Sequence, residues 1–461
     1  MNSLSRPAQI CTACVALACL LSGSSPVSSN SQRGEKTLKL PVNARNPEIC
    51  VIPKHFAGAA YSDKDLKDEE NLCAIEVASA DAVCPKTNST NPGLDIYSLP
   101  AGATPKAVQD AHCKLTGAKK IAKYKLSTSC SYTPSILGYY HLSRMLNGMG
   151  EVPPAVLRTF DLQNHIALGH VALSETPSTS LIHQTWAGLM AQLTAGPAAS
   201  KRDLLLTADF TQSYGALSMN PTKELFYSEF FNGGPNNVAR AQKFRDTNPL
   251  VISLANKTAI NTQVGTTFTT ANVQKMVQLK DISDMIVIDY LMNQQDRFGN
   301  IHYVMRFYYR SKNAGDNSPG EIMVSNKLKP DEVAQLDAVQ VKKMMLKDND
   351  CGVSKQNIAK QTGLIARVAH MDPHTYERVM RLNVAADSPE TTEYFANELL
   401  FTAGDYVAFR NNLKELASTL HDACAQGRLA LDLDLQTHFS NQVPQNQSCE
   451  VSAAAVTPTN H

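Results

Sequence analysis

Asp296 and Asn300 have the residue types and the spacing of a catalytic loop. They belong to the sequence Asp-Arg-Phe-Gly-Asn at residues 296–300, which follows an apolar run over residues 285–292 that is expected to cross the protein interior. In phosphoryl transfer, an aspartate orients and deprotonates the attacking hydroxyl group, while an asparagine holds a metal ion on the phosphates. Aspartate, glycine and asparagine are also ordinary turn formers, so by itself the segment is more typical of a plain turn.

A second acidic segment follows a predicted strand. Residues 342–347 have the pattern of a short strand, and the sequence Asp-Asn-Asp-Cys-Gly follows it at residues 348–352. A strand, an acid and a glycine-containing turn present the metal-holding aspartate to the nucleotide in kinases. Asp348 is favoured for this role because it directly follows the strand, where the backbone is best fixed. Asp350 lies in the turn and is expected to satisfy local backbone groups.

The elements that must position these groups begin upstream. Residues 139–149 are predicted to be helical because their apolar side chains share one helical face, namely Leu142, Met145, Leu146 and Met149. Gly148 and Gly150 end this helix, and the Val-Pro-Pro sequence at residues 152–154 requires extended backbone after it.

Lys125 is the favoured phosphate-contacting residue. Residues 121–126 have the alternating character of a strand shortly before the predicted helix. Lys123 and Lys125 point to the same face of that strand, and Lys125 lies nearer the helix. A solvated lysine face on an edge strand is an equally good interpretation of the same pattern.

Taken together, these segments resemble the secretory-pathway kinases related to the Golgi casein kinase, the xylosyl kinase and four-jointed. The helix-to-strand segment of that family is matched by His141, Leu142, Arg144, Leu146, Val152, Pro153, Pro154 and Arg158. Asp296 and Arg297, at the family's spacing after Asp289, match its catalytic Asp-Arg pair. Asp348 and Asn349 fall where the family has its metal-binding Asp-Asn.

The resemblance implies an α+β, two-lobed protein-kinase-like fold with a loop-rich N-terminal extension. It implies transfer of the terminal phosphoryl group of ATP, bound with Mg²⁺ or Mn²⁺, to a hydroxyl group of a protein or glycan. In that interpretation Asp296 is the catalytic base and Lys125 contacts the nucleotide phosphates. Asp348 and Asn300 are the metal ligands.

One departure from the family keeps other functions open. The family places a glutamate in the helix before the His-Leu pair, where it forms an ion pair with the nucleotide-binding lysine. Residues 133–138 contain no acid. The alternatives are therefore a non-catalytic pseudokinase, an exported binding module, or a structural protein of the cell envelope.

The N-terminal residues have the pattern of an export signal. Arg6 supplies a basic residue, residues 10–21 are apolar and residues 22–25 are small. The apolar stretch is short for a membrane span, and Ala16 fits poorly with a lipidation sequence ending at Cys19. Eight of the eleven cysteines follow this signal, at positions 50, 73, 84, 113, 130, 351, 424 and 449. An even number in an exported chain favours disulfide bonds, whose pairing the sequence leaves open.

Composition and the positions of turn-forming residues set the expected domain boundaries. With 461 residues, of which 43% are hydrophobic, the chain can bury one large two-lobed domain or two domains. The net charge of +1 and the lack of a long basic block argue against a nucleic-acid partner. The predicted divisions begin with a signal peptide (residues 1–24) and a linker with a cysteine-bearing extension (25–110). An N-lobe (111–250), a C-lobe (251–441) and a flexible tail (442–461) follow.

A metal site at His370 and His374 was the other chemical possibility. Their spacing of four residues is compatible with zinc binding on one helical face. However, Asp372 and Pro373 between them are a helix cap and a first-turn proline, which indicates that a helix begins midway. The sequence therefore predicts a capped helix start rather than a zinc site.

Overall fold

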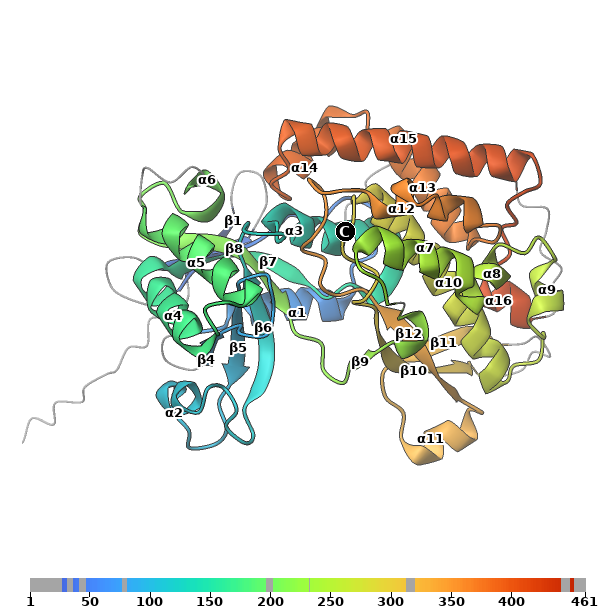
Figure 1. Ribbon diagram of the computed structural model, residues 1–461. Helices are drawn as coiled ribbons and strands as arrows, with labels where there is room; N and C mark the ends of the chain where they lie inside the picture. The colour runs from blue at the N-terminus through green and yellow to red at the C-terminus, as the bar shows by residue number, and fades with distance from the viewer. Residues whose placement is uncertain are drawn as a thin grey trace, which may run out of the picture.

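The computed structural model describes residues 27–30, 36–40, 47–76, 81–195, 202–231, 233–311, 320–440 and 448–451. It has a mixed α+β fold in which a strand-rich region and a helix-rich region lie side by side (Figure 1). The predicted signal peptide lies outside the described residues, as does most of the predicted tail. Within the described ranges, no helix is long and apolar enough to cross a membrane.

The strand-rich region is built on an antiparallel sheet of eight strands in the order β1-β2-β3-β7-β8-β6-β5-β4. The strands are β1 (Val27–Asn30), β2 (Lys36–Leu40), β3 (Glu48–Ile52), β4 (Asp81–Pro85), β5 (Leu94–Ser98), β6 (Lys119–Lys125), β7 (Ala155–Asp161) and β8 (Gln212–Met219). The helices of this region are α1 (Asp63–Cys73), α2 (Pro105–Asp110), α3 (Thr133–Met145), α4 (Leu162–Glu175), α5 (Leu181–Thr194) and α6 (Arg202–Leu205).

Helices α4 and α5 cover one face of the sheet and form its hydrophobic core (Figure 1). Trp186 and Leu189 of α5 pack there in one cluster with Ala122 and Tyr124 of β6. Because side chains alternate along a strand, Lys123 and Lys125 of β6 must point to the opposite face. The predicted strand and the shared direction of its two lysines are therefore confirmed.

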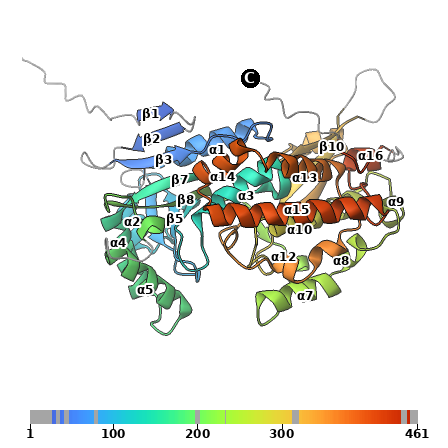
Figure 2. The ribbon, with the colours of Figure 1, turned by 90° about the horizontal axis from the view of Figure 1, so that it is seen from above.

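The helix-rich region is organised around α10 (Thr270–Leu291), whose second half is almost entirely buried. A smaller sheet joins β11 (Ile322–Ser325), β10 (His302–Arg310) and β12 (Val339–Met345), with β9 (Leu225–Phe226) paired to β10. The remaining helices are α7 (Asn237–Thr247), α8 (Pro249–Leu254), α9 (Ile260–Gln263), α11 (Pro330–Gln335), α12 (Ile358–Gln361), α13 (Pro373–Ala385), α14 (Pro389–Asn397), α15 (Ala403–Ala425) and α16 (Leu435–Phe439). Both views place α3 at the boundary between the two regions (Figure 1, Figure 2).

The segment expected to be a loop-rich extension is instead part of the large sheet. Strand β3 pairs with β7, and the β4–β5 hairpin pairs with β6. These strands have only five residues each, and Pro, Asn and Gly occur in the turn between β4 and β5. Short strands give a weak periodic pattern, so the turn residues dominated the sequence interpretation.

The predicted disulfide bonds are confirmed, and all eight cysteines after the predicted export signal are paired. Three bonds are local: Cys50–Cys73, Cys84–Cys113 and Cys424–Cys449. The fourth, Cys130–Cys351, joins the segment between β6 and α3 to the turn after β12, across 221 residues of sequence. Four disulfides fit an exported protein, because such bonds persist in oxidising compartments.

The region around His370 confirms the predicted helix start. Asp372 caps α13 by accepting from the backbone N–H groups of His374 and Thr375. The His370 ring lies between the Asp432 carboxylate, 2.8 Å from Nδ1, and the Asn256 carbonyl oxygen, 2.6 Å from Nε2. Both ring nitrogens therefore have protein partners, as expected for a packed histidine rather than a metal ligand.

Candidate functional site

The segments that contain the candidate residues Lys125 and Asp348 line a small cavity where the strand-rich and helix-rich regions join. The cavity has a volume of about 40 Å³. Lys123 and Lys125 of β6 and Ser218 of β8 line one side, and Asp348 and Asp350, from the turn after β12, line the other. We call residues 348–352 the acidic turn. Three of the predicted segments, the lysine strand, the helix α3 and the acidic turn, are thus brought together.

Lys125 forms a buried ion pair with Asp350. Its Nζ lies 2.6 Å from Asp350 Oδ2, and the two side chains are only 7% and 4% exposed. Burial alone would lower the pKa of Lys125, but the charges of Asp350 and Asp348 raise it above its ordinary value. The Asn91 amide, from the loop between β4 and β5, also donates to Asp350 Oδ2, at 3.2 Å.

Asp348 contacts the other lysine of the strand. Its Oδ1 lies 3.6 Å from Lys123 Nζ, and its side chain is 25% exposed. Burial would raise the pKa of this carboxyl group, but the charges of Lys123, Lys125 and Lys86 together lower it far below its ordinary value. Asp348 is therefore held ionised and is the more accessible of the two acids.

The two acids differ because β12 ends before them. The strand stops at Met345, and Asp348 has a φ of 54°, in the left-handed region. A continued strand would point both carboxylates to the same face, because side chains alternate along a strand. Because the backbone turns instead, Asp348 and Asp350 reach different lysines, and Asp350 does more than satisfy the local backbone.

The acidic turn is fixed from both sides. Ser135 Oγ of α3 donates to the Asn349 carbonyl oxygen at 2.6 Å, and Arg297 Nη2 donates to the Asn349 side-chain oxygen at 2.7 Å. A Cβ atom on Gly352 would lie 2.6 Å from Ser135 Oγ and 2.9 Å from the Met292 carbonyl oxygen. Glycine is thus required at this position for close packing of the turn against α3 and the end of α10.

Arg297 positions the loop that contains Asp296. It is 1% exposed and binds Asp289 through Nε and Nη2, at 2.8 and 2.9 Å. Its Nη1 donates to the Lys347 carbonyl oxygen at 3.0 Å, and Tyr139 of α3 donates to the same Asp289 at 2.8 Å. The Asp289–Arg297 ion pair therefore joins the end of α10, the loop and the segment that follows β12.

Asp296 lies at the edge of this arrangement. Its side chain is 36% exposed, and its Oδ1 is 3.4 Å from Nη2 of Arg240. Burial raises the pKa of Asp296; the Asp350 charge adds to this rise, and the Arg240 charge opposes it. A backbone hydrogen bond also connects the Asp296 loop to the acidic turn, because the Gln295 N–H donates to the Cys351 carbonyl oxygen at 2.9 Å. Asp296 is thus a neighbour of the acidic turn.

The two carboxylates of the acidic turn are the residues that could hold a divalent cation. Among the described residues, no three His, Cys, Asp or Glu side chains converge on one point as a metal-binding group. Magnesium is commonly held by one or two carboxylates together with substrate phosphates, so Asp348 and Asp350 fit an ion that arrives with a nucleotide. The Asn300 side-chain amide donates to the Asp296 carbonyl oxygen at 3.3 Å, so Asn300 lies in the same turn as Asp296.

Sequence reasoning missed three contributors to this site. Asn91 and Lys86 come from the segment that was interpreted as a loop-rich extension, and Arg240 comes from α7. The spacing of Cys130 and Cys351 was the available signal, because each lies within five residues of Lys125 or Asp350. A bond between them predicts the contact of strand and turn, but pairing cannot be deduced from sequence. No protein-family model and no curated protein matches this chain.

Proposed function

We propose that this protein is an exported kinase-like phosphotransferase that moves the terminal phosphoryl group of ATP to a hydroxyl group of a protein or glycan. The observation that supports this most is the buried Lys125–Asp350 ion pair, with Asp348 beside it and Asp296 next to the same turn. A lysine for phosphates, an acid for a metal ion and an acid for the acceptor hydroxyl are the three groups that kinases require.

The order of the elements along the chain supports a two-lobed kinase-like arrangement. The β4–β5 hairpin precedes β6, which holds Lys125, and α3 follows. Asp296 then follows α10, and the acidic turn follows β12. In protein kinases a loop over the phosphates, a lysine strand, a helix, a catalytic loop and a metal-binding turn occur in this order. Lys125 has its partner in Asp350, which explains how the lysine is held although α3 contributes no acid.

Each residue then has a defined part in the reaction. Lys125 binds and orients the donor phosphates, and Asp296 accepts the proton of the attacking hydroxyl group. The raised pKa of Asp296 suits a general base, because proton acceptance is more favourable when the pKa approaches the working pH. Asp348 would hold Mg²⁺ or Mn²⁺, which would supply positive charge to the phosphates in the transition state, while Asp350 holds Lys125 in place.

A non-catalytic binding protein of the same fold is the second candidate. The cavity of about 40 Å³ is far smaller than the several hundred Å³ of typical ligand sites, so the regions must separate to admit a nucleotide. The Asp296 carboxylate is also engaged with Arg240. Both features suit a protein that keeps the fold for recognition.

The two candidates are separated by testing the mature protein for metal-dependent ATP binding and for transfer of radiolabelled phosphate. For the kinase, Asp296→Ala is expected to reduce transfer at least a hundredfold with little change in ATP affinity, since a general base acts in the transition state. Asp331→Ala, at an exposed position in α11, is the matched control and should retain full transfer. Tight ATP binding without transfer by the wild type would establish the binding protein, and wild-type transfer by Asp296→Ala would remove Asp296 from the mechanism.

A further inference from the structure

The loop between β4 and β5, residues 86–93, contacts the acidic turn through Asn91. Asn91 contacts both sides of the junction: its amide donates to Asp350 at 3.2 Å, and its side-chain oxygen accepts from the Cys130 N–H at 3.3 Å. The Lys86 N–H donates to the Gly93 carbonyl oxygen at 2.9 Å and closes the hairpin. A Cβ atom on Gly93 would lie 2.9 Å from the Tyr124 carbonyl oxygen, so the loop lies directly against β6.

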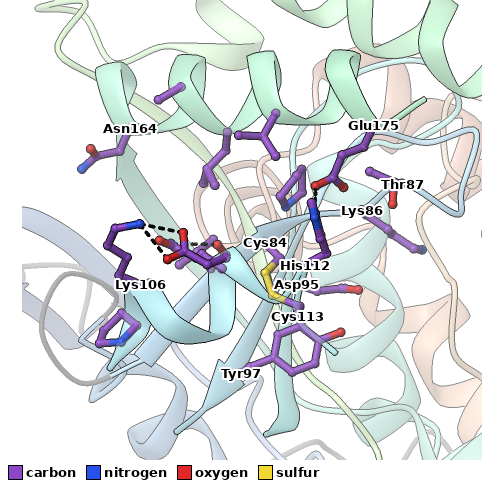
Figure 3. A pocket seen from close by; sticks show the side chains of 18 of the residues that line it. Cys84, Lys86, Thr87, Asp95, Tyr97, Lys106, His112, Cys113, Asn164 and Glu175 are labelled. Carbon is purple, nitrogen blue, oxygen red and sulfur yellow. Dashed lines mark hydrogen bonds and ion pairs between the residues drawn. A yellow bond between two sulfur atoms is a disulfide. The ribbon is translucent and has the colours of Figure 1, made fainter. Parts of the chain in front are cut away.

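Lys86, at the start of this loop, is close to the charged groups of the site. The sheet register pairs Cys84 with Asp95 and Asp95 with Lys123, which places these three residues on one face. Burial lowers the pKa of Lys86 to about 8, with the charge of Lys125 contributing and that of Asp348 opposing. Lys86 also lines a larger cavity, of about 990 Å³, around the edge strand β4 (Figure 3).

Lys86 differs from the other lysines of the site in having no partner for its ammonium group among the described residues. Lys123 is paired with Asp348, Lys125 with Asp350 and Lys347 with Glu224. Within the part of the chain that the structure describes, the Lys86 ammonium group has neither an ion-pair nor a hydrogen-bond partner. Figure 3 shows the contrast among the residues drawn there: dashed lines leave the Lys106 ammonium group, whose partner is Asp110, and none leaves Lys86.

An unpaired cation in a partly buried position is costly unless an anion binds to it. We propose that Lys86 is a further phosphate-binding residue, which contacts the triphosphate of the donor when the loop 86–93 closes over it. This assignment rests on the proposed function and extends it. Lysine binds phosphate as a compact point charge, and Lys86 begins the same loop whose Asn91 donates to Asp350. The triphosphate would then be contacted by Lys86 as well as Lys125, with Asp348 available for its metal ion.

The test is calorimetric titration of the full mature chain with three probes: inorganic triphosphate with Mg²⁺, ATP with Mg²⁺, and adenosine. Lys86→Ala is expected to weaken triphosphate and ATP binding at least about tenfold and to leave any adenosine binding unchanged, because one charge-assisted contact is lost. Lys86→Arg should retain most of the affinity. Lys106→Ala is the matched control, since Lys106 lines the same cavity but is already paired, and it should bind like the wild type.

The outcomes separate this proposal from the proposed function. Equal triphosphate affinity in wild type and Lys86→Ala would overturn the role of Lys86 and leave the kinase proposal standing. Loss of triphosphate binding in Lys86→Ala, in a protein that neither prefers ATP nor transfers phosphate, would support Lys86 and overturn the kinase. A wild type that binds no triphosphate would overturn both. Acylation of lysines followed by mass spectrometry gives a second readout, in which Mg²⁺-triphosphate should protect Lys86 and not Lys106.

Discussion

Two clusters of lysines and aspartates in this molecule consist of the same residue types but differ in how completely their charges are paired. In the core of the helix-rich region, Asp281 binds Lys343 and the Met344 N–H, while Asp284 binds Lys280 and the Thr375 hydroxyl group. We call this the core cluster. Each of its charges has a charged partner, and its residues come from α10, β12 and α13.

The junction cluster, formed by Lys86, Lys123, Lys125, Asp348 and Asp350, is different. It opens on two cavities, and Lys86 has no partner among the described residues. The comparison teaches that burial of charge alone does not identify a functional site. A fully paired cluster is what a structural role needs, whereas an unpaired charge beside a cavity leaves free energy that a ligand can recover.

The largest effect is expected from breaking the covalent bond that holds the junction cluster. Replacing Cys130 and Cys351 by alanine opens a loop of 221 residues and should lower the free energy of unfolding by about 5 kcal/mol, against about 3 kcal/mol for the local bond Cys424–Cys449. Chemical denaturation of the two double variants measures this. The Cys130/Cys351 variant should also lose ATP affinity, and the Cys424/Cys449 variant should not. Equal ATP affinities of the two variants would show that the Cys130–Cys351 bond is not needed to form the binding site.

The core cluster is expected to be structural. Asp281→Ala leaves Lys343 buried without its main partner and should destabilise the protein by about 3–5 kcal/mol. The folded fraction should bind ATP like the wild type. Urea unfolding followed by ATP titration at low denaturant checks both parts. An unchanged unfolding midpoint, or a selective loss of ATP binding, would contradict the structural assignment.

The two acids of the junction cluster should separate in their metal dependence. Asp348 is the more exposed, whereas Asp350 is engaged by Lys125 and Asn91. We therefore expect Asp348→Ala to lose the Mn²⁺ dependence of ATP binding, by tenfold or more for a lost charged contact. Asp350→Ala should keep the dependence but bind ATP more weakly, because Lys125 is no longer positioned. Titration of Mn²⁺ against the ATP complexes of both variants shows which aspartate holds the metal. The reverse pattern would assign the metal to Asp350.

The smallest expected effect is a pH dependence from Lys86. Its folded pKa of about 8 lies below the ordinary lysine value, so keeping it charged costs stability below pH 8, and this cost declines as the pH rises through 8. The groups whose charges act on it are Lys125, Asp348, Lys123 and Asp95. Between pH 7 and 9.5 the wild type should gain about 1–2 kcal/mol relative to Lys86→Met. Unfolding curves across this range measure the difference, and parallel curves would show that Lys86 does not titrate there.

Much of the local structure was predictable because its signals are short-range. The Asp-Pro start of α13 needs only its own backbone, since an aspartate caps the N–H groups directly after it. The alternation of β6 likewise fixed the shared direction of Lys123 and Lys125. The even number of cysteines after the predicted export signal also predicted that they would be bonded, although not to which partners.

The rest depended on contacts between distant segments. Whether residues 48–52 and 81–98 form loops or strands was decided by the pairing of β3 with β7 and of β5 with β6, which short sequences cannot specify alone. Lys86 and Asn91 became part of the site only through that pairing.

What the sequence by itself determined is an inventory of charged and cysteine residues placed on local elements: a lysine strand, an aspartate after a buried run, and an acidic turn. What only the tertiary structure decided is which lysine meets which acid. The reason is that Asp348 takes a left-handed backbone conformation where the turn is packed against α3 and bonded to Cys130. This conformation ends the strand alternation, so Asp350, rather than Asp348, pairs with Lys125.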